Sequence, residues 1–82
     1  MRAMIGLGRN RLSLGRDLRL INADGDAVWL EGTVRLRPGQ AVDLVGHWPT
    51  EPMTPRGHVV SWHLTRLGPE GPIYRGCVRL QR

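Results

Sequence analysis

Residues 27–36 read AVWLEGTVRL, and every valine and leucine among them falls on an even position. The apolar residues of one parity are Val28, Leu30, Val34 and Leu36. Because successive side chains of a strand point to opposite faces, this alternation predicts a strand with one face on a core. Glu31 and Gly32 interrupt the run, which indicates a turn or a bulge at that point.

Four further runs of strand length show similar alternation. They cover residues 16–21, 41–45, 58–64 and 73–80. In the run 58–64 the side chains predicted to face one side together are Val60, Trp62 and Leu64. No window has the apolar period of a capped helix, so strands are expected throughout.

Glycine and proline mark the turns between these runs. The cluster 22–26 contains the hairpin-forming pair Asp24-Gly25, and Pro38-Gly39 marks a second turn. Residues 46–57, which include three prolines, and residues 68–72 are expected to be loops. We therefore predict an all-β fold, a small antiparallel β-barrel of five to six strands.

The chain has 82 residues, enough for one domain with a modest core. Its formal net charge is +5, and all 12 basic residues are arginine. Arginine pairs bidentately with phosphate and stacks on bases, so this composition favours an anionic partner such as a nucleotide, a nucleic acid or an acidic protein. The coding composition of a genome can produce the same bias, and the sequence leaves both explanations open.

Cys77 is the single cysteine, which excludes an internal disulfide bond. No apolar run has membrane-spanning length, and residues 1–8 are too short for a signal peptide. A cytoplasmic protein without a membrane span is therefore the expectation. No serine has a neighbouring base that the sequence identifies, so an enzyme is not expected.

Four segments together carry a family resemblance. They are LINADGDA at residues 20–27, LRPGQAVDL at 36–44, GHVVSW at 57–62 and YRGCVRL at 74–80. In this order and spacing they resemble the PilZ domain, the small β-barrel with which many bacterial proteins sense cyclic di-GMP, over roughly three quarters of the chain. The resemblance implies a PilZ-like barrel over residues 16–82, after an arginine-containing lead-in or first strand over residues 1–15.

The resemblance also implies a cyclic di-GMP site at the first of these segments, where the family has a [D/N]-x-S-x-x-G motif. Asn22 fits the first position, whereas Asp24 stands where serine is expected and Ala27 where glycine is expected. The family's R-x-x-x-R pair is absent as such, and Arg9 and Arg11 are the arginines predicted to clamp the ligand. The Asp24 carboxylate would repel a phosphate and Ala27 disfavours positive φ, so tight binding by the standard mode is not expected.

The predicted function is a PilZ-like binding domain that senses cyclic di-GMP or, in a degenerate form, acts through contacts with a protein partner. The alternative is a basic β-barrel that binds single-stranded nucleic acid, with Trp29 or Trp48 as stacking platforms. An exposed strand edge would also permit a homodimer. The ligand hypothesis requires the Asn22 turn and the arginine-bearing lead-in to meet at one mouth of the barrel.

The side chains that bind soft metals are scattered. The three histidines and Cys77 have no C-x-x-C or H-x-x-x-H spacing. In a regular strand His58 and His63 would face opposite sides, because they are an odd number of positions apart. Neither a metal site nor a cofactor is therefore expected.

Overall fold

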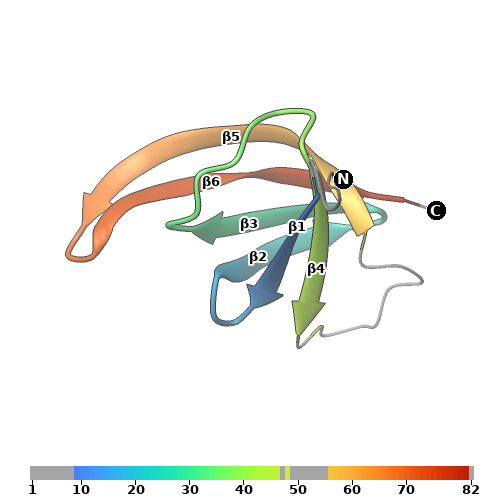
Figure 1. Cartoon of the computed structure of the whole chain (residues 1–82), viewed down its shortest axis with the longest axis horizontal. Coiled ribbons are helices and arrows are strands. Elements are labelled where there is room, and N and C mark those ends of the chain that lie inside the picture. The colour runs from blue at the N-terminus through green and yellow to red at the C-terminus, as the bar shows by residue number, and fades with distance from the viewer. Residues whose placement is uncertain (1–8, 47, 49–55, 82) are drawn as a thin grey trace, which may run out of the picture.

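The computed structural model describes residues 9–46, 48 and 56–81, and only the backbone of residues 9 and 10. Within these residues six strands form a closed barrel in the order β1-β2-β3-β6-β5-β4 (Figure 1). They are β1 (Arg9–Leu14), β2 (Leu18–Asp24), β3 (Ala27–Gly32), β4 (Ala41–Gly46), β5 (Arg56–Gly68) and β6 (Gly71–Leu80). The predicted all-β barrel is confirmed. The described part of the chain contains no helix with the length and apolar character needed to cross a membrane.

The strand pairing is mixed, and the prediction of a purely antiparallel barrel is wrong in this respect. The pairs β2–β3, β3–β6, β6–β5 and β5–β4 are antiparallel. In contrast, β1 runs parallel to β4 from Arg9↔Ala41 to Leu14↔Gly46. Among the described residues, β1 meets β2 in one parallel bridge at Leu14↔Leu18, across the short turn that joins the two strands.

The chain connection explains the parallel pair. After β3, residues 33–40 do not return as a hairpin but cross the barrel (Figure 1) and lead into β4 beside β1. Two backbone hydrogen bonds hold the end of this crossover against β5: Gly39 N donates to Val59 O, and Val59 N donates to Gln40 O. Alternation along a strand indicates which face a residue takes and not which strand lies beside it, so the sequence does not reveal this crossover.

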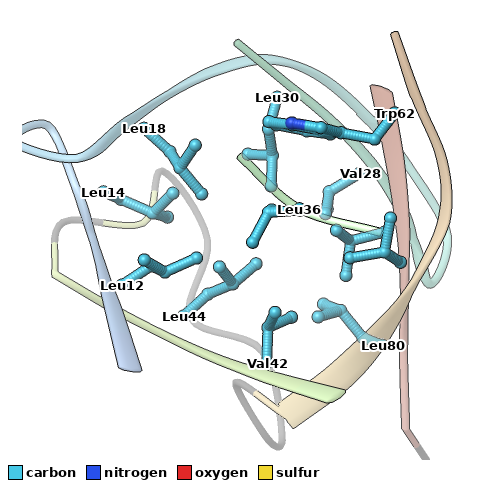
Figure 2. Close-up of a cluster of buried hydrophobic side chains, with 12 residues drawn as sticks. Leu12, Leu14, Leu18, Val28, Leu30, Leu36, Val42, Leu44, Trp62 and Leu80 are labelled. Atoms are coloured by element: carbon cyan, nitrogen blue, oxygen red, sulfur yellow. The ribbon is translucent and has the colours of Figure 1, made fainter. Parts of the chain in front are cut away.

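The alternating apolar residues meet in one core to which every strand contributes (Figure 2). The most deeply buried members, each at most 1% exposed, are Val28, Leu30, Val42, Leu44, Val59 and Val78. Leu36, from the crossover, reaches into the middle of the cluster, and Trp62 lies along one side of it beside Leu30 (Figure 2). Burying an aliphatic side chain of this size contributes about 1.5–3 kcal/mol, so this cluster is what holds the strands together.

A bulge in β5 overturns one predicted side-chain orientation. The pairing of β5 with β6 shifts between Val59 and Ser61, so Val60 is an extra residue in the ladder. The sequence pattern predicted that Val60 faces the core, but it is 47% exposed while Val59 is 1% exposed. Because a bulge resets the two-residue period, the residues on its two sides no longer follow one parity.

The turn between β2 and β3 is tighter than predicted. The sequence indicated a turn over residues 22–26, but β2 continues through Asp24 and the turn consists of Gly25 and Asp26. Gly25 has a φ of 64°, a left-handed conformation that glycine adopts without strain. Asn22 and Asp24 are therefore strand residues with direct neighbours on β3.

The hairpin of β5 and β6 is the longest in the described structure, and its far end extends beyond β3 (Figure 1). The loop expected over residues 68–72 is a tight turn at Pro69-Glu70. Leu64 was predicted to face the core, yet it is 57% exposed, and Leu67 is 78% exposed. Leu67 lies beyond the last pair of β3 with β6, Gly32↔Tyr74, and Leu64 pairs with Tyr74 at that limit.

Candidate functional site

Three of the predicted ligand-binding residues lie together on the outer side of β2 and β3. Asn22 is directly opposite Trp29, and Asp24 is directly opposite Ala27. Directly opposite residues share a face, and this face points outward because Val28, between Ala27 and Trp29, lies in the core. We name this surface the β2–β3 face; it consists of Asn22, Asp24, Trp29, the adjoining Arg79 of β6, and Ala27, which is covered to 9% exposure.

Trp29 is the exposed aromatic side chain of this face. It is 36% exposed, whereas its chain neighbours Val28 and Leu30 are at most 1% exposed. A solvent-facing indole ring on a strand is a platform on which a planar base can stack. Asn22, across the ladder, carries an amide that can both donate to and accept from a base edge; its Oδ1 accepts from Ala23 N at 2.9 Å.

Arg79 borders the face from β6, directly opposite Ala27. Its Nη1 lies 3.2 Å from Oδ1 of Asp26, and the two side chains are 54% and 27% exposed. An exposed pair of this kind contributes only about 0–1 kcal/mol, so a ligand phosphate can replace the carboxylate. The exposed Asp24 carboxylate on the same face acts in the opposite direction, because it repels an anion.

The two arginines predicted to clamp the ligand belong to β1. Arg9, whose side chain lies outside the described residues, pairs with Ala41, and Arg11 pairs with Asp43. The bridge between β1 and β2 lies at the end of β1 and the start of β2, away from Arg9 and from Asn22. In Figure 2 the pale blue β1 and the turn joining β2 to β3 lie on opposite sides of the core. The structure thus groups three of the five predicted residues and places β1 apart from them.

Three arginines converge on one carboxylate beside this face. Glu31 is only 6% exposed, and Arg19 and Arg75 lie directly opposite it on the two neighbouring strands. Its Oε1 lies 2.6 Å from Arg19 Nη2, and its Oε2 lies 2.9 Å from Arg75 Nη2 and 3.4 Å from Arg66 Nη1. Both oxygens of Glu31 are therefore used, and the three arginines share one partner.

These contacts hold the pKa of Glu31 at about 2, below its ordinary value of 4.5. Hydrogen bonds from Arg19 and then Arg75 are the main causes, the charges of Arg19 and Arg66 add to them, and burial opposes the shift. The carboxylate is therefore ionised at neutral pH. Because Arg66 and Arg75 belong to the long hairpin, this Glu31 cluster fastens the hairpin to β2 and β3.

A separate cavity of about 590 Å³ lies at the crossover between β3 and β4. We call it the arginine–aromatic pocket; its lining residues are Arg35, Leu36, Arg37, Trp62 and Tyr74. Trp62 Nε1 donates a hydrogen bond of 3.0 Å to Val34 O, which fixes the indole ring. Arg37 N donates to Gln40 Oε1 at 3.0 Å, which fixes the adjacent turn. Both the ring and the backbone of the pocket are thus held by the protein itself.

The described residues include no group of three or more His, Cys, Asp or Glu side chains that could hold a metal ion. His47 lies outside these residues. The predicted opposite orientation of His58 and His63 is wrong: they pair with Arg79 and Arg75, which are both outward residues of β6. The β5 bulge lies between the two histidines and brings them to the same side.

Comparison with known proteins adds no assignment. No family model, curated protein or solved structure matches this chain. Function is therefore inferred from the side chains of the β2–β3 face and of the arginine–aromatic pocket.

Sequence reasoning did not identify Arg79, the Glu31 cluster or the arginine–aromatic pocket. Arg79 could have been found, because it alternates with Val78 and Leu80, which were predicted to share the core face. The Glu31 cluster and the pocket join residues from strands and loops far apart in the chain. Alternation within one strand carries no signal for such pairings.

Proposed function

We propose that this protein is a small non-catalytic, PilZ-like domain that binds cyclic di-GMP on the β2–β3 face. The observation that carries the proposal is the exposed ring of Trp29 with Asn22 directly opposite it. A guanine base can stack on this ring while the Asn22 amide meets its edge. Arg79 then supplies the contact to a phosphate, in place of the predicted Arg9 and Arg11.

The Asp24 carboxylate makes this a weak site. At an effective dielectric constant of about 20, two like charges about 4 Å apart repel each other by roughly 4 kcal/mol, and solvent around an exposed carboxylate lowers that value. We therefore expect weak affinity. If cyclic di-GMP does not bind at all, contacts with a protein partner are the remaining role for a PilZ-like domain.

Calorimetric titration of the full chain with cyclic di-GMP tests the proposal. Trp29→Leu removes the ring but keeps an apolar side chain, and Arg79→Ala removes the phosphate contact; each is expected to weaken binding by about tenfold. Arg16→Ala is the matched control, since Arg16 is also exposed and lies in a loose pair, 3.8 Å from Asp17. Absence of heat at high micromolar ligand would remove direct sensing and leave the protein-contact role.

Restoring the family motif is expected to strengthen binding. The double variant Asp24→Ser with Ala27→Gly removes the repelling carboxylate, adds a hydroxyl donor and lets the ligand approach the backbone. We expect the dissociation constant for cyclic di-GMP to fall by about tenfold or more in the same titration. If the affinity for cyclic di-GMP does not increase, the missing arginine pair, rather than the changed motif, is the main cause of weak binding.

Single-stranded nucleic acid is the second candidate ligand, favoured by the exposure of Trp29 on a chain of net charge +5. Trp48, the other predicted platform, instead packs partly against the core. Fluorescence anisotropy with a labelled oligonucleotide at two salt concentrations distinguishes this function. Binding through arginine–phosphate contacts weakens steeply with salt, so a flat response counts against it.

A further inference from the structure

The arginines of the arginine–aromatic pocket differ from most others in the described structure. Six of the arginines that the structure describes lie 2.6–3.8 Å from an Asp or Glu oxygen, namely Arg16, Arg19, Arg56, Arg66, Arg75 and Arg79. Among the described residues, Arg35 and Arg37 have no carboxylate partner, and no carboxylate lines their pocket. Within the part of the chain that the structure describes, two guanidinium groups without a carboxylate partner therefore border the same cavity.

The backbone presents these two side chains together. Arg35 and Arg37 flank Leu36, which is 5% exposed and points into the core. Because they are two positions apart on an extended segment, both turn away from Leu36 toward the exterior. The hydrogen bond from Trp62 Nε1 to Val34 O holds the segment in place. A bound ligand therefore does not need to order this backbone, which lowers the entropy cost of binding.

Aromatic side chains form the other wall of the cavity. Trp62 is 8% exposed and belongs to the core, while Tyr74 is half-buried and packs against that core. Flat rings beside guanidinium groups favour a ligand that has a planar apolar body and an anionic head. The cavity of about 590 Å³ has the size of small-molecule sites, on the order of 300–1,000 Å³.

We propose that the arginine–aromatic pocket binds a small organic anion in which a planar ring carries a phosphate-type head group. Arg35 and Arg37 bind the head group, and Trp62 and Tyr74 contact the ring. The site is separate from the β2–β3 face, because Tyr74 and the outward-facing Arg75 are consecutive on β6 and point to opposite sides of the sheet. The inference does not depend on whether cyclic di-GMP binds.

Calorimetry of the full chain with 2-naphthyl phosphate as the probe tests this site, with inorganic phosphate and 2-naphthol in parallel titrations. Naphthyl phosphate is expected to bind at least about tenfold more tightly than either fragment. Arg35→Ala and Arg37→Ala should each weaken it by about tenfold, whereas Arg16→Ala should leave it unchanged. Tyr74→Leu should weaken the binding of naphthyl phosphate and leave the binding of inorganic phosphate unchanged.

Arg35 and Arg37 are exposed and unpaired among the described residues, so their removal should leave the thermal unfolding midpoint unchanged. No binding of naphthyl phosphate at millimolar concentration, or equal binding by the Arg35→Ala/Arg37→Ala double variant, overturns the proposal. Cyclic di-GMP titrated into the same variants separates the two sites. If cyclic di-GMP binding is lost in the Arg35→Ala/Arg37→Ala double variant but not in Trp29→Leu, the pocket is supported and the assignment of cyclic di-GMP to the β2–β3 face fails. If binding is lost in Trp29→Leu but not in the double variant, the assignment to the β2–β3 face is supported, and the naphthyl phosphate titration alone decides the pocket.

Discussion

Gly76→Ala is expected to lower the free energy of unfolding by about 3 kcal/mol, the largest loss from any single added methyl group that we expect here. Gly76 lies in the middle of β6, directly opposite Leu30 on β3 and Trp62 on β5. A Cβ atom at this position would overlap the carbonyl oxygen of Ser61 and lie 2.6 Å from Cε3 of Trp62. The first neighbour is backbone, so the β5–β6 ladder must shift, and Trp62 must move with it.

Urea unfolding followed by tryptophan fluorescence measures this loss. Gly39→Ala is the matched comparison: Gly39 has a φ of 89°, and a Cβ there would have no atom within 4 Å. That variant is strained by its backbone conformation alone, which costs about 1–2 kcal/mol. If Gly76→Ala lowers the free energy of unfolding no more than Gly39→Ala does, the close packing of Trp62 on β6 is not what stabilises this region.

Glu31→Gln is expected to produce the second large loss of stability, and the size of this loss depends on pH. The substitution keeps the shape of the side chain but removes the charge that Arg19, Arg66 and Arg75 share, so the three guanidinium groups repel one another around an uncharged amide. We expect a clearly lower urea midpoint at neutral pH. The far end of the β5–β6 hairpin should also become more accessible to protease, because Arg66 and Arg75 hold it to the barrel.

The direction of the pH effect is set by the depressed pKa of Glu31. The folded protein holds this carboxyl ionised down to about pH 2, whereas the unfolded chain protonates it near 4.5. Its contribution is therefore present above about pH 4.5 and is lost as the pH falls from there to about 2. The difference in free energy of unfolding between the original protein and Glu31→Gln should therefore disappear as the pH falls from about 4.5 to about 2. Asp26→Asn, which breaks an exposed ion pair, is the control. A difference in free energy of unfolding between the original protein and Glu31→Gln that stays constant with pH would contradict the role of the Glu31 charge.

The alternation of residues 27–36 and of the other runs was sufficient to predict an all-β barrel and most of its core. Val28, Leu30, Val42 and Leu44 are at most 1% exposed, as expected of the inward positions of half-buried strands. Asn22, Asp24 and Ala27 lie on one hairpin, whose turn the sequence marks with Asp24-Gly25.

Two of the wrong predictions occur where an irregularity in one strand reverses the orientation of the residues near it. Val60 was assigned to the core and His63 to the side opposite His58, and the β5 bulge reverses both. A bulge is one extra residue that the partner strand accommodates, so its position depends on the register between two strands. Alternation read along one strand cannot locate it.

The amino-acid sequence by itself indicated five of the six described strands, most of the inward side chains and the excess of arginine over acidic residues, because these depend only on local periodicity and composition. Only the tertiary structure decided that β1 lies parallel to β4, that one carboxylate, Glu31, is shared by three arginines, and that Arg35 and Arg37 are left beside two aromatic rings. Ion pairs form between atoms a few ångströms apart, and the crossover and the bulges set which charges come that close. The charges available for a ligand are therefore a property of the folded barrel.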